Sequence, residues 1–111
     1  MRDERRSSPR YAFDAAAEAA IEGMKERVPA RVTEIGLNGC YLQMGNPPAL
    51  GSQVFVKIFA EGSFFEANAR VVYSRANSGM GIQFRELKPY FVGVLKKWLL
   101  EAMVSKQKPR D

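Results

Sequence analysis

Apolar and polar side chains alternate with a period of two along most of this chain, as in strands that bury one face. Six such segments follow one another, separated by turns that carry glycine, asparagine or proline. The predicted strands cover residues 11–22, 27–34, 40–44, 53–59, 64–73 and 80–84. Short strands with tight connections predict an antiparallel barrel or sandwich.

The first segment leaves two interpretations open. Residues 11–22 are rich in alanine, whose intrinsic propensity favours a helix. Within the same segment, however, Tyr11 and Phe13 alternate with polar positions such as Asp14 and Glu18, which is the period of a strand. We expect a strand.

The pattern changes near the C-terminus. Pro89 suits the first turn of a helix. The apolar residues that follow at helical spacing are Phe91, Leu95, Trp98, Leu99 and Ala102. This spacing predicts an amphipathic helix of about four turns, whose apolar face closes the open end of the barrel. We expect Trp98 and the pair Phe64–Phe65 in the core.

Composition narrows the range of possible functions. A chain of 111 residues with 46% apolar residues fits one globular domain. The single cysteine, Cys40, excludes an internal disulfide and fits a reducing cytoplasm. Because the chain has no histidine, it excludes zinc sites of the His/Cys type and nucleophiles activated by histidine. We therefore expect no enzyme, no metal and no cofactor. We also expect no secretory signal and no membrane span.

Charge suggests how the chain is divided. Residues 1–10 are arginine-rich and predict a flexible arm, residues 11–104 form the domain, and residues 105–111 form a charged tail. The net charge of +5 favours partners that carry phosphate.

Two short motifs carry the candidate chemistry. Arg6 and Arg10 lie four residues apart in the arm, beside Arg5. The second motif is Glu34-Ile35-Gly36-Leu37-Asn38-Gly39. With the later strand Gly81-Ile82-Gln83-Phe84, these motifs resemble the signature of the PilZ domain, R-x-x-x-R followed by D/N-x-S-x-x-G. The resemblance extends from Arg5 to the end of the helix.

The resemblance implies a fold and a ligand. The fold is a small bacterial six-stranded antiparallel β-barrel with a C-terminal helix, and the ligand is the second messenger cyclic di-GMP. The candidate site residues are Arg5, Arg6, Arg10, Glu34, Gly36, Asn38 and Gly39. A guanidinium matches the O6 and N7 acceptors of guanine and stacks on purines. In the family, the final glycine of the second motif allows a positive φ and a close approach of backbone to base.

The second motif departs from the family pattern at two positions. Glu34 stands where aspartate or asparagine is usual, and Gly36 stands where serine is usual. A lost hydrogen bond weakens binding by about 0.5–1.5 kcal/mol, or roughly 3- to 10-fold. Asn38 and Thr33 are close enough in sequence to compensate. Restoring serine at position 36 should tighten binding if the hydroxyl matters.

Three functions follow, in order of preference. The first is a single-domain cyclic di-GMP receptor, monomeric or homodimeric, whose arm orders on binding and changes a surface read by a protein effector. The family's outputs are motility, pilus function and exopolysaccharide production. The second is a degenerate adaptor that acts by protein contact without the ligand. The third, which we favour least, is a nucleic-acid-binding barrel.

Overall fold

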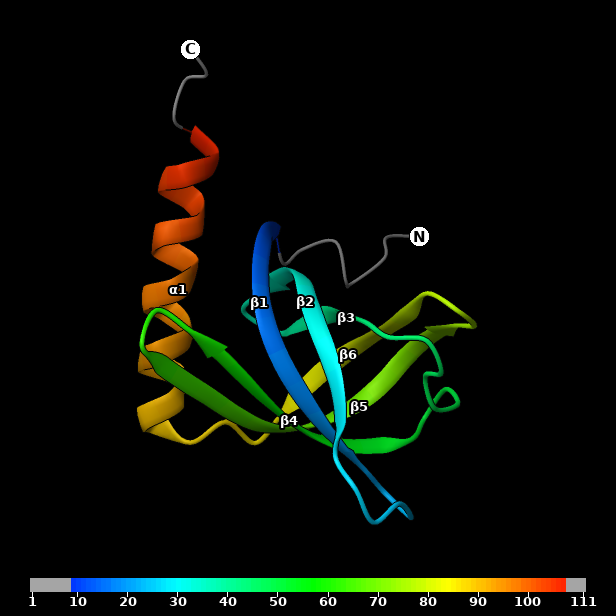
Figure 1. The fold of residues 1–111 in the computed structure, drawn as a ribbon. Helices are drawn as coiled ribbons and strands as arrows, with labels where there is room; N and C mark the ends of the chain where they lie inside the picture. Colours follow the sequence, from blue (N-terminus) through cyan, green and yellow to red (C-terminus); the bar gives the residue numbers. More distant parts are fainter. Residues whose placement is uncertain (1–8, 108–111) are drawn as a thin grey trace, which may run out of the picture.

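The structure, a computed structural model, describes the backbone of residues 9–107 and the side chains of residues 9–104. Six strands form a closed antiparallel barrel in the order β1-β2-β3-β6-β5-β4 (Figure 1). The strands are β1 (Arg10–Ile21), β2 (Val28–Gly36), β3 (Gly39–Gln43), β4 (Gln53–Ala60), β5 (Ser63–Arg75) and β6 (Gly79–Arg85). The predicted barrel and its six strands are confirmed.

Strand β1 closes the barrel, because it pairs with β2 on one side and with β4 on the other. The alanines of β1 explain how this strand fits into the closed barrel. Ala15, Ala17 and Ala19 point into the core and are almost fully buried, and their small side chains leave room for larger ones from the other strands. Burial of alternate positions therefore overrides the helical propensity of alanine here.

A bulge interrupts the pairing of β1 with β2. The register shifts between Ala12 and Ala15, so that Phe13 and Asp14 stand opposite one residue of β2. The bulge lets Phe13 pack on the helix while Asp14 turns to solvent. There Asp14 accepts a 2.6 Å hydrogen bond from Nε of Arg31, which lowers the pKa of the carboxyl.

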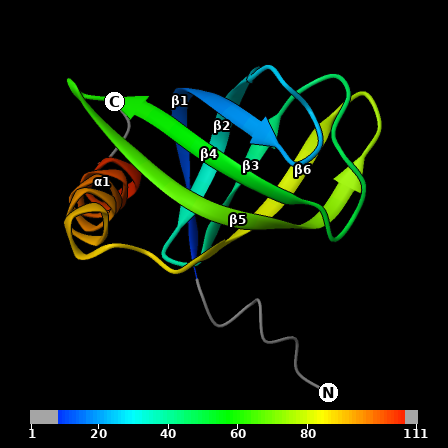
Figure 2. The same cartoon turned by 90° about the horizontal axis from the view of Figure 1, so that it is seen from below.

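Helix α1 (Pro89–Gln107) lies along one side of the barrel, next to the β4–β5 hairpin (Figures 1 and 2). Its 19 residues make about five turns, one more than predicted. Trp98 is 1% exposed, and its ring centroid lies 5.5 Å from that of Phe13 and 6.2 Å from that of Phe65. Leu95 and Leu99 join the same buried cluster as the strands, so the apolar face of α1 packs on the core.

Trp98 and Phe65 are buried as predicted, but the prediction for Phe64 is wrong. Phe64 is 38% exposed on the outer face of β5, because neighbouring residues of a strand point to opposite faces. Its ring packs 5.6 Å from that of Phe91 on α1, and Nζ of Lys57 lies 4.6 Å above it.

The predicted division into arm, domain and tail stays a prediction, since residues 1–8 and 108–111 lie outside the described part of the chain. Arg5 and Arg6 fall in this region. Arg10, the last residue of the predicted arm, is the first residue of β1. Between residues 9 and 107, no helix combines the length and apolar character needed to cross a membrane.

Candidate functional site

The two sequence motifs meet where β1 begins and β2 ends. Arg10 pairs with Gly36 in the ladder, and two residues further along Ala12 pairs with Glu34. The side chains of Arg10 and Glu34 are both exposed. Barrel closure therefore brings the last arginine of the first motif beside the second motif, although 25 residues separate Arg10 from residue 36.

Arg10 and Glu34 carry opposite charges on adjacent strands but do not pair. Neither side chain makes a hydrogen bond or an ion pair with the residues that the structure describes. The two residues are diagonal neighbours on the sheet, about 7–8 Å apart. A donor group and an acceptor group thus face solvent side by side.

Gly36 is buried beneath the chain that leads into β1. A Cβ atom at this position would lie 2.6 Å from the carbonyl oxygen of Pro9 and 3.3 Å from Cγ of Arg10. The backbone at Pro9 thus fills the space where the usual serine side chain of this motif would begin. In this arrangement there is no room for the serine that was expected to tighten binding.

Gly39 is required for a different reason than expected. The glycines with positive φ within the described residues are Gly23, Gly51 and Gly62. Gly39 is not one of them, so this glycine does not use the positive φ that the family motif allows. Instead, a Cβ atom on Gly39 would collide with the carbonyl oxygen of Ile82 on β6. The glycine permits a close approach of two strands.

Leu37 and Asn38 form the connection between β2 and β3. The carbonyl oxygen of Asn38 accepts a 2.8 Å hydrogen bond from the backbone N–H of Phe84, which ties this turn to the end of β6. Arg10, Glu34 and Gly36 therefore lie together at one edge of the barrel, with Asn38 in the turn beside them and Gly39 at the start of β3.

One neighbour of the motif was missed in the sequence. Tyr41 of β3 pairs directly with Glu34 of β2, and its half-buried ring lies on the outer face. The signal was present, since Cys40 and Leu42 are apolar positions that point inward. Tyr41 stands between them and must point outward.

Cys40 lies behind this edge, in the core. Its side chain is fully buried, and burial raises the pKa of the thiol to about 12, while the positive charge of Arg10 lowers it. Cys40 is a core residue, as predicted. Among the described residues, no cluster of cysteine, aspartate and glutamate is arranged to hold a metal ion.

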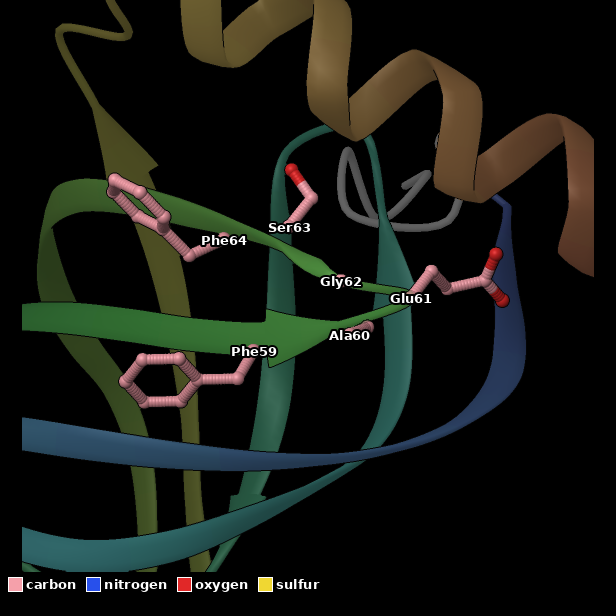
Figure 3. A pocket seen from close by; sticks show the side chains of 6 residues that line it. All are labelled: Phe59, Ala60, Glu61, Gly62, Ser63 and Phe64. Carbon is pink, nitrogen blue, oxygen red and sulfur yellow. The ribbon is translucent and has the colours of Figure 1, made fainter.

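Two hollows flank the barrel near α1. One, of about 500 Å³, lies over the β4–β5 hairpin and is lined by residues 59–64 (Figure 3). At its edge the Glu61 carboxyl hydrogen-bonds to Glu101 of α1, and this bond together with the repulsion between the two groups raises the pKa of Glu61. No residue of the two motifs lines this hollow.

The second hollow adjoins the motifs and measures about 310 Å³. Pro9, Tyr11 and Leu37 line it from the barrel. Its other wall belongs to α1 and consists of Lys96, Leu99, Leu100 and Met103. Pro9 therefore covers Gly36 at the end of β2 with its carbonyl oxygen and also borders the helix.

Comparison with known proteins identifies the family. The family model of the PilZ domain matches residues 4–101. A comparison with curated proteins gave no match. Domains of the PilZ family are receptor or adaptor domains.

Solved structures share the fold at low sequence identity. The inhibitor of motility MotI/DgrA of Bacillus subtilis is 14% identical with a TM-score of 0.76, over 97% of this chain and 56% of that one. The PilZ domain of YcgR from Escherichia coli, solved with c-di-GMP, is 11% identical with a TM-score of 0.75, over 94% of this chain and 95% of that one. The PilZ domain of CeSA from a cellulose-synthesizing bacterium is 15% identical with a TM-score of 0.66, over 90% of this chain and all of that one. With the family model matching nearly the whole chain, this protein belongs to the PilZ domain family.

Proposed function

We propose that this chain is a single-domain cyclic di-GMP receptor that acts as an adaptor. The ligand binds at the edge formed by Arg10, Glu34 and Gly36, with Arg5 and Arg6 closing over it from the arm. The observation that carries the proposal is the guanidinium of Arg10 beside the carboxylate of Glu34, neither of which has a hydrogen-bond or ion-pair partner among the described residues.

This pair of groups matches the chemistry of guanine. The O6 and N7 atoms of guanine accept hydrogen bonds, as a guanidinium requires, and its amino group donates, as a carboxylate requires. The phosphates of the ligand add a favourable interaction with arginine. A surface that held Arg10 and Glu34 in an ion pair would have to break that pair before binding.

The route to an output follows from the position of Pro9. Its carbonyl oxygen covers Gly36, and the same residue lines the apolar hollow against α1. A ligand that orders the arm also repositions Pro9, and this changes the surface between Tyr11 and Leu99 that a protein effector reads. We infer outputs in motility, pilus function or exopolysaccharide production, in the cytoplasm.

One observation favours the second candidate, an adaptor that works without cyclic di-GMP. At Gly36 the hydroxyl of the family motif is absent, and backbone fills its place. In that case the apolar hollow beside α1 would bind a protein partner regardless of the ligand.

Two arginine substitutions test the proposal. We expect Arg6→Ala and Arg10→Ala each to abolish cyclic di-GMP binding in a calorimetric titration. Because Arg10 is exposed, its loss should change the free energy of unfolding by no more than about 0.5 kcal/mol. Arg27→Ala is the matched control, since Arg27 lies beside the far end of β2 and forms an ion pair there with Glu18. Binding that survives both substitutions contradicts the site, and a wild-type protein without binding supports the ligand-free adaptor.

A further inference from the structure

The outer face of α1 carries apolar side chains that none of the six strands covers. In both views of the fold the helix stands at the edge of the molecule, with the barrel on one side of it (Figures 1 and 2). Its inner face packs on the core, where Leu95, Trp98 and Leu99 are buried. Leu100 and Val104 lie four residues apart, on one face of the helix, and are 61% and 56% exposed.

The exposed apolar surface extends from the helix to the turn between β2 and β3. Leu100 and Met103 line the hollow of about 310 Å³ together with Leu37 of that turn, and Leu37 is itself 46% exposed. Single exposed apolar side chains are ordinary, but a group of neighbouring ones marks a surface that contacts a protein or a membrane. We call Leu37, Leu100, Met103 and Val104 the helix patch.

Basic residues border the helix patch. Lys96 and Lys97 precede Leu100 by one turn of α1, and both are exposed. The carboxyl of Glu101 is hydrogen-bonded to Glu61 of the β4–β5 hairpin, so it is directed toward the barrel. From residue 96 to residue 110 the sequence has five basic residues and one acidic residue, namely Lys96, Lys97, Lys106, Lys108 and Arg110 against Glu101.

We propose that the helix patch docks this protein on an anionic membrane surface. Leu100 and Val104 enter the boundary between lipid headgroups and acyl chains, while the lysine ammonium groups stay at the lipid phosphates. The cytoplasmic leaflet of a membrane carries negative charge, and each basic residue near such a surface strengthens binding roughly fivefold. Because a few apolar side chains insert only shallowly, the contact is peripheral and reversible.

Charge favours a membrane over a second copy of this chain. Two copies that met through the helix patch would both present a positively charged face, and like charges oppose such a contact. A bilayer with anionic lipids supplies the negative charge that a second copy lacks. The sequence continues for four residues beyond α1 and adds Lys108 and Arg110, so the positive charge extends past the end of the helix.

Sedimentation with lipid vesicles tests the proposal. The full chain should sediment with vesicles that mix phosphatidylcholine with phosphatidylglycerol, but not with vesicles of phosphatidylcholine alone, and molar salt should release it. Lys96→Gln and Lys97→Gln should each weaken the binding roughly fivefold. Leu100→Gln should weaken it roughly 10-fold, because its apolar side chain no longer enters the lipid.

Two matched controls lie away from the helix patch. Lys25→Gln changes an exposed lysine in the turn between β1 and β2. Leu50→Gln changes a leucine that is 67% exposed in the connection between β3 and β4, across the barrel from α1 (Figure 1). Lys25→Gln should retain vesicle binding within about twofold, since it lies far from the proposed contact, and Leu50→Gln should leave it unchanged.

A fluorescent label reports directly whether α1 contacts lipid. Because Cys40 is fully buried, a polarity-sensitive iodoacetamide dye can be attached to Val104→Cys alone. Its emission should shift to the blue when phosphatidylglycerol vesicles are added. The same dye on Leu50→Cys should not shift.

Each outcome bears on the proposal. Absence of sedimentation, or equal sedimentation with neutral and anionic vesicles, overturns it, and so does a dye at Val104→Cys that does not shift. If Leu100→Gln fails to fold, the dye at Val104→Cys decides. A wild-type dimer that Leu100→Gln dissociates, without vesicle binding, would assign the helix patch to a second copy and refute the proposal. Because these vesicles are tested without cyclic di-GMP, failure here leaves the receptor function standing.

Discussion

The carbonyl oxygen of Pro9 lies 2.6 Å from the position that a Cβ atom on Gly36 would occupy. The departure of this chain from the family motif at Gly36 is therefore linked to the path of the chain that enters β1. The absence of a serine side chain at position 36 and the close approach of Pro9 depend on each other. A substitution at either position should therefore be expected to affect the other.

Gly36→Ser should therefore weaken cyclic di-GMP binding. The new side chain must displace Pro9 and Arg10 from the end of β2, at a cost of about 1 kcal/mol or more, typical of overpacking. Calorimetry gives the affinity, and backbone NMR shifts at Arg10 and Tyr11 report the displacement. Tighter binding with unchanged shifts at these residues would show that the serine fits and that the hydroxyl alone was missing.

Gly39→Ala should destabilise the barrel. Its Cβ atom would collide with the backbone carbonyl of Ile82, which cannot move away without disturbing the pairing of β3 and β6. We expect a loss of about 1–3 kcal/mol in the free energy of unfolding by denaturant titration. The control is Gly93→Ala on α1, where a Cβ atom meets nothing within 4 Å and should stabilise by about 0.5–1 kcal/mol. Equal effects of the two substitutions would contradict the close approach at Gly39.

Contact between the β4–β5 hairpin and α1 should depend on pH. Hydrogen bonding and repulsion with Glu101 raise the pKa of Glu61 above its ordinary value of 4.5, although Lys97 lowers it. The folded state thus binds the proton more tightly than the unfolded chain does. This contribution to stability is present below the ordinary pKa and is lost as the pH rises through the raised one.

Glu101→Gln removes the repulsion and tests whether the stability contributed by this contact falls as the pH rises. Its melting temperature relative to that of the wild-type protein should rise between pH 4 and pH 7, because only in the wild-type protein does the Glu61 carboxyl lose its proton beside the carboxylate of Glu101. Glu26→Gln, in the exposed turn between β1 and β2, serves as the control. A difference for Glu101→Gln that does not change with pH would refute the coupling.

Cys40 should report global unfolding. Because burial raises the pKa of its thiol to about 12, the native protein should react with iodoacetamide at pH 8 far more slowly than a free thiol does. Denatured protein should react fully, and a ligand that binds only the folded state should slow the reaction further. Rapid alkylation of the native protein would contradict the buried position of Cys40.

Much of the barrel was predictable, because each strand buries one face and the alternation is strong. Even the alanine-rich β1 could be recognised once the period of its buried positions was weighed against helix propensity. The exposure of Phe64 could not be assigned, because Phe64 and Phe65 are both apolar and the sequence does not say which one faces the core.

The site was less predictable, because it depends on distances between strands. The sequence motifs indicated Arg10, Glu34 and Gly36 but could not show that the backbone at Pro9 fills the place of the missing serine. Nor could they show that glycine is needed at position 39 because β6 approaches closely there, and not because of a positive φ. The position of Tyr41 beside Glu34 depends on the register of β2 and β3 and on the bulge between them, which no local pattern specifies.

A calorimetric titration of the full chain with cyclic di-GMP at physiological salt, with GTP as the control ligand, tests the receptor function most directly. We expect saturable binding of cyclic di-GMP, a raised melting temperature and no heat with GTP. No heat up to high micromolar cyclic di-GMP, together with an unchanged melting temperature, would contradict it and would mean that Glu34 and Gly36 have disabled the site.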